Sequence, residues 1–197
     1  MFYLLDPEKW ERQKHFEYYM QMIPCGYTVT VRLDVENLYQ QVKKCGLKFY
    51  PAFIYCTGKV VNEKREFKMG VDQEGRPGYF DVMHPNFTIF HKDDHTFSDI
   101  WSYYDDDFQT CYQNIINDME TYKDVKRTQR KRRAAAKLLL YLLCAMDGFH
   151  RLQHMGANRK TKSISDHYIW KICGRRGQKK AVCCFDDISC IRRWISC

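Results

Sequence analysis

Apolar residues in the first part of the chain follow two distinct periods. The opening segment places large apolar side chains near one face of a helix: Trp10, Phe16, Tyr19 and Met20. Pro7 follows Asp6, which is typical of a helix start, so the pattern predicts a helix from residue 7 to about residue 22. Residues 27–35 instead alternate with β-branched side chains, which predicts a half-buried strand.

These patterns continue to about residue 122. They predict, in order, a short helix through 38–44 that ends at Gly46, a buried helix at 51–62, hairpin strands at 67–71 and 79–82, a strand at 88–90, and a helix at 97–122. Helices and strands are mixed along the chain. The predicted fold class is therefore α/β or α+β.

The composition changes abruptly at residues 126–133, which have the sequence KRTQRKRR. Before this point the chain has 14 Lys and Arg against 20 Asp and Glu, a net charge of −6. From residue 126 onward it has 18 against 4, a net charge of +14. Such asymmetry is typical of a globular domain followed by a basic tail, so we divide the chain into residues 1–125 and 126–197.

The composition as a whole is that of a globular protein. Hydrophobic residues make up 45% of the chain, which is enough to build a core. We find no signal peptide at the start, and no apolar run reaches the roughly 18 residues of a membrane span. None of the ten cysteines form a CxxC pair, so reduced thiols are favoured over a zinc or redox site. We therefore expect a cytoplasmic protein without a membrane segment or a metal.

Six segments resemble, in order and nearly without gaps, the chloramphenicol acetyltransferase family: WERQKHFEYY, IPCGYTVTVRLDV, KFYPAFIY, EFKMGVD, MHPNFTIFHKDDHTFSDIW and YYDDDF. The resemblance covers residues 3 to about 123. It implies a two-layer α/β sandwich, here incomplete and followed by a poorly folded basic tail. It also implies trimers that transfer an acetyl group from acetyl-CoA to a hydroxyl of chloramphenicol, in clefts between neighbouring subunits.

The resemblance further implies which residues line the acceptor pocket: Tyr18, Tyr19, Ile23, Cys25 and Phe97. Arg12 matches the arginine that, in the family, pairs with an aspartate near the catalytic histidine. Without the family, ordinary core is the favoured explanation of each aromatic residue, and the resemblance shifts the preference to the pocket. Cys25 is expected to be pocket wall and not a nucleophile, because no neighbouring base or positive group would activate its thiol.

The catalytic histidine of the family has no counterpart in this frame. The resemblance implies a histidine general base, in an HHxxxDG signature near the C-terminus, and a serine hydroxyl that stabilises the oxyanion. Residues 144–150, CAMDGFH, imitate the signature, but Leu142 and Leu143 replace the histidine pair and the segment comes too early. We therefore predict that His150 is not the base, and we assign no catalytic residue.

A one-base slip of the reading frame would account for this loss. Met146-Asp147 must be encoded ATG GAY, which one base later reads TGG, tryptophan. With permitted codons, three stretches then resemble family segments in family order: 145–152 as PWMDFTGY, 162–172 as SPYPIITFGKY and 189–197 as HAYADGFH. The last contains the missing histidine signature. We expect the slip between residues 123 and 133, and it would also explain the tail's charge.

Two other interpretations stay open from the residues. The basic tail could make the protein a nucleic-acid-binding module, which salt-sensitive binding to random DNA would favour. No RRM, KH or zinc pattern accompanies the tail, so we expect no specific nucleic acid. Alternatively, the chain is an active acyltransferase with His150 as its base, which hydroxyl-dependent turnover of acetyl-CoA would favour.

The frame slip also predicts how the tail behaves. Residues 134–146 are apolar enough to form a helix. Residues beyond about 130 should make few long-range contacts with residues 7–122. Because the family's trimers bury C-terminal surfaces that this frame does not encode, we expect aggregated or polydisperse species and no clean trimer.

Overall fold

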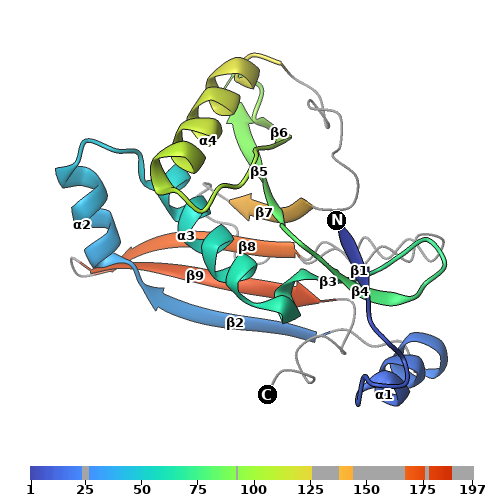
Figure 1. Ribbon diagram of the computed structural model, residues 1–197. Helices are drawn as coiled ribbons and strands as arrows, with labels where there is room; N and C mark the ends of the chain where they lie inside the picture. The colour runs from blue at the N-terminus through green and yellow to red at the C-terminus, as the bar shows by residue number, and fades with distance from the viewer. Residues whose placement is uncertain (24–26, 92, 126–137, 144–166, 176–177, 188–197) are drawn as a thin grey trace.

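The computed structural model describes residues 1–23, 27–91, 93–125, 138–143, 167–175 and 178–187 (Figure 1). Its elements in chain order are β1 (Phe2–Leu4), α1 (Gln13–Glu17), the π-helix η1 (Tyr18–Met22), β2 (Tyr27–Asp34), α2 (Glu36–Lys44), α3 (Phe49–Glu63), the 3₁₀ helix η2 (Arg65–Lys68), β3 (Met69–Val71), β4 (Pro77–Phe80), β5 (His84–His91), β6 (Thr96–Trp101), α4 (Phe108–Tyr122), β7 (Leu138–Leu143), β8 (His167–Arg175) and β9 (Gln178–Asp187). Among these described residues, no helix combines the length and apolarity that a membrane crossing requires.

The described strands form two sheets. The smaller sheet is antiparallel, with the order β1-β4-β3. The larger one has six strands in the order β2-β9-β8-β7-β5-β6. It is mixed, because β7 runs parallel to β5 and β8 while the other neighbouring pairs are antiparallel. The fold class is therefore one of mixed helices and strands, as predicted.

The hydrophobic core joins α3 and α4 to the six-stranded sheet. Figure 1 shows α4 beside β5 and β6, and α2 near the end of the sheet that holds β2 and β9. The buried residues of this core come from both layers: Val35, Phe53, Ile54, Tyr55, Val61, Met83, Phe87, Ile100, Cys111 and Ile115. The predicted buried helix at 51–62 is confirmed as α3, whose long apolar run supplies four of these side chains.

The predicted β-hairpin is confirmed as β3 and β4. Steric crowding explains why residue 78 in β4 is glycine. Strand β4 pairs on its other side with β1, so Gly78 lies between Gly70 and Leu4. A Cβ atom at Gly78 would approach the backbone oxygen of Tyr3 to 2.4 Å. Only glycine lets the three strands come this close. The sequence pattern does not predict β1, because three residues are too few to show an alternation.

Two predicted helices have the wrong extent. The helix expected at residues 7–22 begins only at Gln13 and continues as η1, because residues 7–12 form turns. The helix expected at 97–122 is wrong in its first part, since residues 96–101 form β6 and α4 begins at Phe108. Backbone pairing of β6 with β5 along its whole length overrides the helical spacing of its apolar residues.

The expectation that the tail makes few long-range contacts is wrong for its described residues. β7 pairs with β5, and β9 pairs with β2 over eight residues, so both join the sheet of the first part. The helix expected at 134–146 is likewise wrong for residues 138–143, which form β7. The physical reason is that open sheet edges present unpaired backbone groups, and nearly any strand-forming run can satisfy them.

Asp107 caps the N-terminus of α4 and makes the stability of that helix depend on pH. Its Oδ2 accepts hydrogen bonds from the backbone N–H and the hydroxyl of Thr110, both at 2.8 Å. These bonds, the backbone one foremost, hold the pKa of Asp107 below its ordinary value. A lowered folded-state pKa means that the carboxylate stabilises the fold above its ordinary pKa of about 3.9 and loses this effect as the pH falls further.

We expect Asp107→Asn to weaken this pH dependence, because asparagine caps a helix about as well but does not titrate. Between about pH 5 and pH 2, the variant should lose less free energy of unfolding than the unchanged chain in urea titrations. Asp124→Asn, which removes an exposed carboxylate outside the cap, is the control. Equal losses in all three proteins would contradict the assignment.

Candidate functional site

Four of the residues implied for the pocket and its support lie in the segment before β2: Arg12, Tyr18, Tyr19 and Ile23. Arg12 precedes α1, and its carbonyl accepts the backbone N–H of Phe16 at 3.0 Å. Phe16 is buried and packs with partly buried Trp10, Tyr19 and Met20. This small apolar cluster fixes α1 and therefore sets the position of the residues that follow.

Tyr18, Tyr19 and Ile23 present apolar surface at the end of this segment. The rings of Tyr18 and Tyr19 meet edge to face with centroids 5.2 Å apart. Tyr18 is 40% exposed and Ile23 is 52% exposed, whereas Tyr19 packs on Phe16. Tyr19 is therefore partly buried in the small apolar cluster, whereas the large exposed ring of Tyr18 is available for contacts.

The side chain of Arg12 is partly buried. Its Nη1 atom is buried and has no hydrogen-bond partner within the described structure. A buried guanidinium nitrogen without an acceptor is costly, because it has lost its water without gaining a hydrogen bond. This position in the fold therefore calls for an acceptor, most favourably a carboxylate.

Phe97 lies at one edge of the six-stranded sheet, and the other implied pocket residues precede β2, the strand at the opposite edge. It belongs to β6, where its backbone pairs with Phe90. β6 and β2 are the two outer strands of the six-stranded sheet, and Figure 1 shows α1 and β6 toward opposite ends of the molecule. Five strand spacings of about 4.8 Å give roughly 24 Å between those edges. The fold of one chain therefore does not bring Phe97 to Tyr18 and Ile23.

Two further residues of the sequence analysis, Cys25 and His150, lie outside the described residues. Cys45, Cys56 and Cys111 are free thiols. Burial raises the pKa of Cys56 and of Cys111, which disfavours the reactive thiolate at both. Within the described ranges, no group of three or more His, Cys, Asp or Glu side chains is arranged to hold a metal.

A histidine–serine pair that the sequence analysis did not single out lies in the β5–β6 hairpin. The Nε2 atom of His91 is 2.9 Å from the Oγ of Ser98. This is the spacing of a base and a nucleophile, but His91 is 6% exposed and Ser98 is 1% exposed. A substrate carbonyl cannot reach a hydroxyl that is buried in this way, so the pair ties two strands together.

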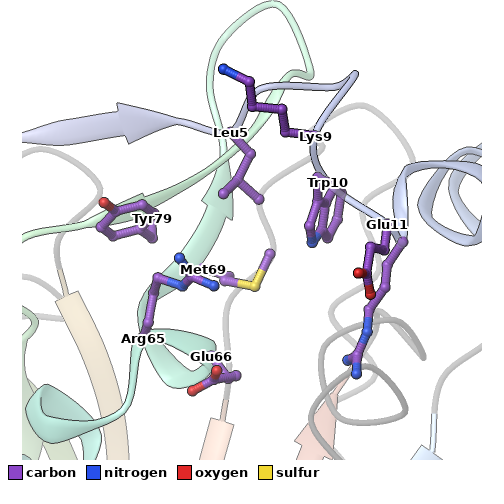
Figure 2. A pocket seen from close by; sticks show the side chains of 9 residues that line it. Leu5, Lys9, Trp10, Glu11, Arg65, Glu66, Met69 and Tyr79 are labelled. Carbon is purple, nitrogen blue, oxygen red and sulfur yellow. The ribbon is translucent and has the colours of Figure 1, made fainter.

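The structure also contains a cavity of about 310 Å³ between the N-terminal segment and the small sheet. Figure 2 shows Tyr79 and Trp10 on opposite sides, with Arg65 and Met69 between them and Glu66 below. The full lining is Leu5, Lys9, Trp10, Glu11, Arg12, Arg65, Glu66, Met69 and Tyr79. These residues come from separate stretches of sequence, so no local motif could have revealed the cavity.

Comparisons with known proteins agree on one family. The family model for chloramphenicol acetyltransferase matches residues 1–141. A chloramphenicol acetyltransferase of Clostridium perfringens is 43% identical over 124 residues, which are 63% of this chain and 57% of that protein. One of Vibrio anguillarum is 38% identical over 130 residues, 66% of this chain and 58% of that protein. The match therefore spans less than two thirds of the length of these relatives.

A solved structure of a chloramphenicol acetyltransferase has the same fold. It superposes with a TM-score of 0.78, over 94% of this chain and 89% of that chain, at 20% sequence identity. Identity this low supports shared architecture only. The family model, in contrast, covers well over half of the sequence. The chain therefore belongs to the chloramphenicol acetyltransferase family.

Proposed function

We propose that the function encoded here is acetyl transfer from acetyl-CoA to a hydroxyl of chloramphenicol or a similar acceptor, and that this chain has lost it with its catalytic histidine. The observation that carries the proposal is where the likeness to the family lies. The family model matches residues 1–141. The alignments with the relatives from Clostridium perfringens and Vibrio anguillarum, at 43% and 38% identity, are 124 and 130 residues long. Those lengths are close to that of the part before Lys126, where the composition changes.

The proposed acceptor pocket consists of Tyr18, Tyr19, Ile23, Cys25 and Phe97. Support comes from the exposed ring of Tyr18 and the exposed side chain of Ile23, since aromatic and aliphatic walls suit an acceptor with an aromatic ring. Phe97 lies at the opposite edge of the sheet, so in this proposal a neighbouring copy supplies it. That arrangement agrees with pockets between subunits of a trimer.

Arg12 is the proposed support of the site. Its buried Nη1 has no acceptor within the described structure, as expected if its partner belongs to a segment that this frame no longer encodes. The frame-shifted version of residues 189–197, HAYADGFH, contains an aspartate four residues after its histidine. Pairing of that aspartate with Arg12 would satisfy the buried nitrogen and place the histidine beside the pocket.

The tail from residue 126 is proposed to be translated out of frame. Its strands β7 to β9 are compatible with this origin, because backbone hydrogen bonds do not depend on side-chain identity. A general base is different, since it needs one specific side chain at one position. Out-of-frame residues can therefore complete a sheet and still leave the chemistry absent.

Sequencing the DNA that encodes residues 123–133 tests the loss of frame. We expect that one added or removed base in this stretch opens a frame encoding Pro-Trp at residues 145–146 and the histidine signature at the end. A DNA sequence whose shifted frame contains stop codons, or lacks the histidine codon at residue 189, would contradict the proposal.

A further inference from the structure

The cavity beside the N-terminal segment has the size and walls of a small-molecule site. Its volume of about 310 Å³ corresponds to roughly ten water volumes of about 30 Å³ each. Trp10 and Tyr79 lie on opposite sides of it with Arg65 and Met69 between them, and Leu5 adds apolar surface. A flat apolar group of one ring would fit on the Trp10 side of the cavity, against Trp10 and Met69.

The charges in this cavity come in both signs and are not paired with each other. Arg65 extends between Tyr79 and Trp10, and its guanidinium carbon lies 5.7 Å from the centre of the Tyr79 ring. Glu66 lies below it. The ion pairs found within the described residues include neither Arg65 nor Glu66, although the two are adjacent in sequence. Their backbones, both in the short helix η2, send the two side chains in different directions.

The rest of the lining leaves the cavity close to neutral. Lys9 forms an ion pair with Asp6 at 3.2 Å, while Arg12 and Glu11 add one charge of each sign. A dianion such as phosphate would meet Glu11 and Glu66 as well as the cations, so its binding is disfavoured. A neutral molecule would leave both kinds of charge without a partner. The ligand best matched to this lining carries one negative and one positive group.

We propose that this cavity binds a zwitterionic α-amino acid with an aromatic side chain. The carboxylate would lie against the Arg65 guanidinium, the ammonium against the Glu66 carboxylate, and the ring against Trp10 and Met69. This site does not depend on acetyl transfer, because none of these four residues belongs to the proposed acceptor pocket.

Ligand titrations of the full chain by saturation-transfer NMR test the proposal with three probes that share one ring. L-Phenylalanine carries both charges, 3-phenylpropionate only the carboxylate and phenethylamine only the ammonium. We expect L-phenylalanine to bind in the millimolar range, as a ligand of twelve heavy atoms should. Each probe with a single charge should bind about tenfold more weakly. Equal binding of all three, or no binding of L-phenylalanine, would overturn the proposal.

Paired variants then assign each charge. Arg65→Gln should weaken L-phenylalanine and 3-phenylpropionate by about tenfold. Glu66→Gln should weaken L-phenylalanine and phenethylamine but leave 3-phenylpropionate unchanged. Lys64→Gln and Glu63→Gln remove the same charges from exposed neighbours that do not line the cavity, and they should change nothing. Equal effects of the lining and control variants would also overturn the proposal, and the probe series on the unchanged chain stands even if a variant misfolds.

Discussion

A frame-restored form of this chain will release thiol from acetyl-CoA, in the presence of chloramphenicol, at least about ten thousand times faster than the chain as given. A general base typically contributes about a hundred to ten thousand fold, and an oxyanion donor a further factor of about a hundred or more. In our proposal, the chain as given has lost the catalytic histidine with its reading frame. Arg12 and Tyr18 remain, but their proposed roles are support of the site and binding surface, and not proton transfer.

The control for this result is His150→Ala in the chain as given. If His150 is not the base, this variant will match its parent, and both will release thiol at the rate seen without chloramphenicol. The measurement is thiol release with and without chloramphenicol for all three proteins. Chloramphenicol-dependent turnover by the chain as given that disappears in His150→Ala would show that the present frame has a working base.

Phe87→Ala will cost about 3–5 kcal/mol of the free energy of unfolding, the usual loss for a fully buried phenylalanine. Phe87 has no exposed surface, and its ring meets that of Tyr50 edge to face at 6.1 Å. It also lies on β5, directly opposite Ile100 of β6 and Tyr141 of β7. Its removal would leave a cavity at the point where the helices pack on the sheet.

The matched control for Phe87→Ala is Val60→Ala, which shortens a side chain that is 52% exposed on α3. It should change the free energy of unfolding by no more than about 0.5 kcal/mol. Urea titrations followed by circular dichroism give both values. A loss below about 1 kcal/mol for Phe87→Ala would mean that β5 is not the centre of the core.

Local patterns were reliable where one element could be recognised by its own residues. The alternation at 27–35 became β2, and the long apolar run at 51–62 became α3. They failed at residues 96–101, where helical spacing of apolar residues coincides with a strand. The strand forms because β5 offers a complete row of backbone partners, and that information lies outside the segment.

The candidate site likewise has some residues that the sequence could place together and others whose position depends on the fold. The residues Tyr18, Tyr19 and Ile23 follow one another in sequence, so the family resemblance alone could place them together. The position of Phe97 at the opposite sheet edge depends on strand order, which no local pattern contains. The cavity beside Trp10 and Tyr79 likewise needs three separate stretches of the chain to meet.

The sequence by itself determined the family and the change of composition at residue 126, because each is a property of residue identity and order. Only the tertiary structure decided that β7 and β9 join the sheet, that the Nη1 atom of Arg12 is buried without an acceptor in the described structure, and that Arg65 and Glu66 line one cavity. These facts depend on distances between residues far apart in the chain. Folding sets such distances through backbone pairing and burial, which act on the whole molecule at once.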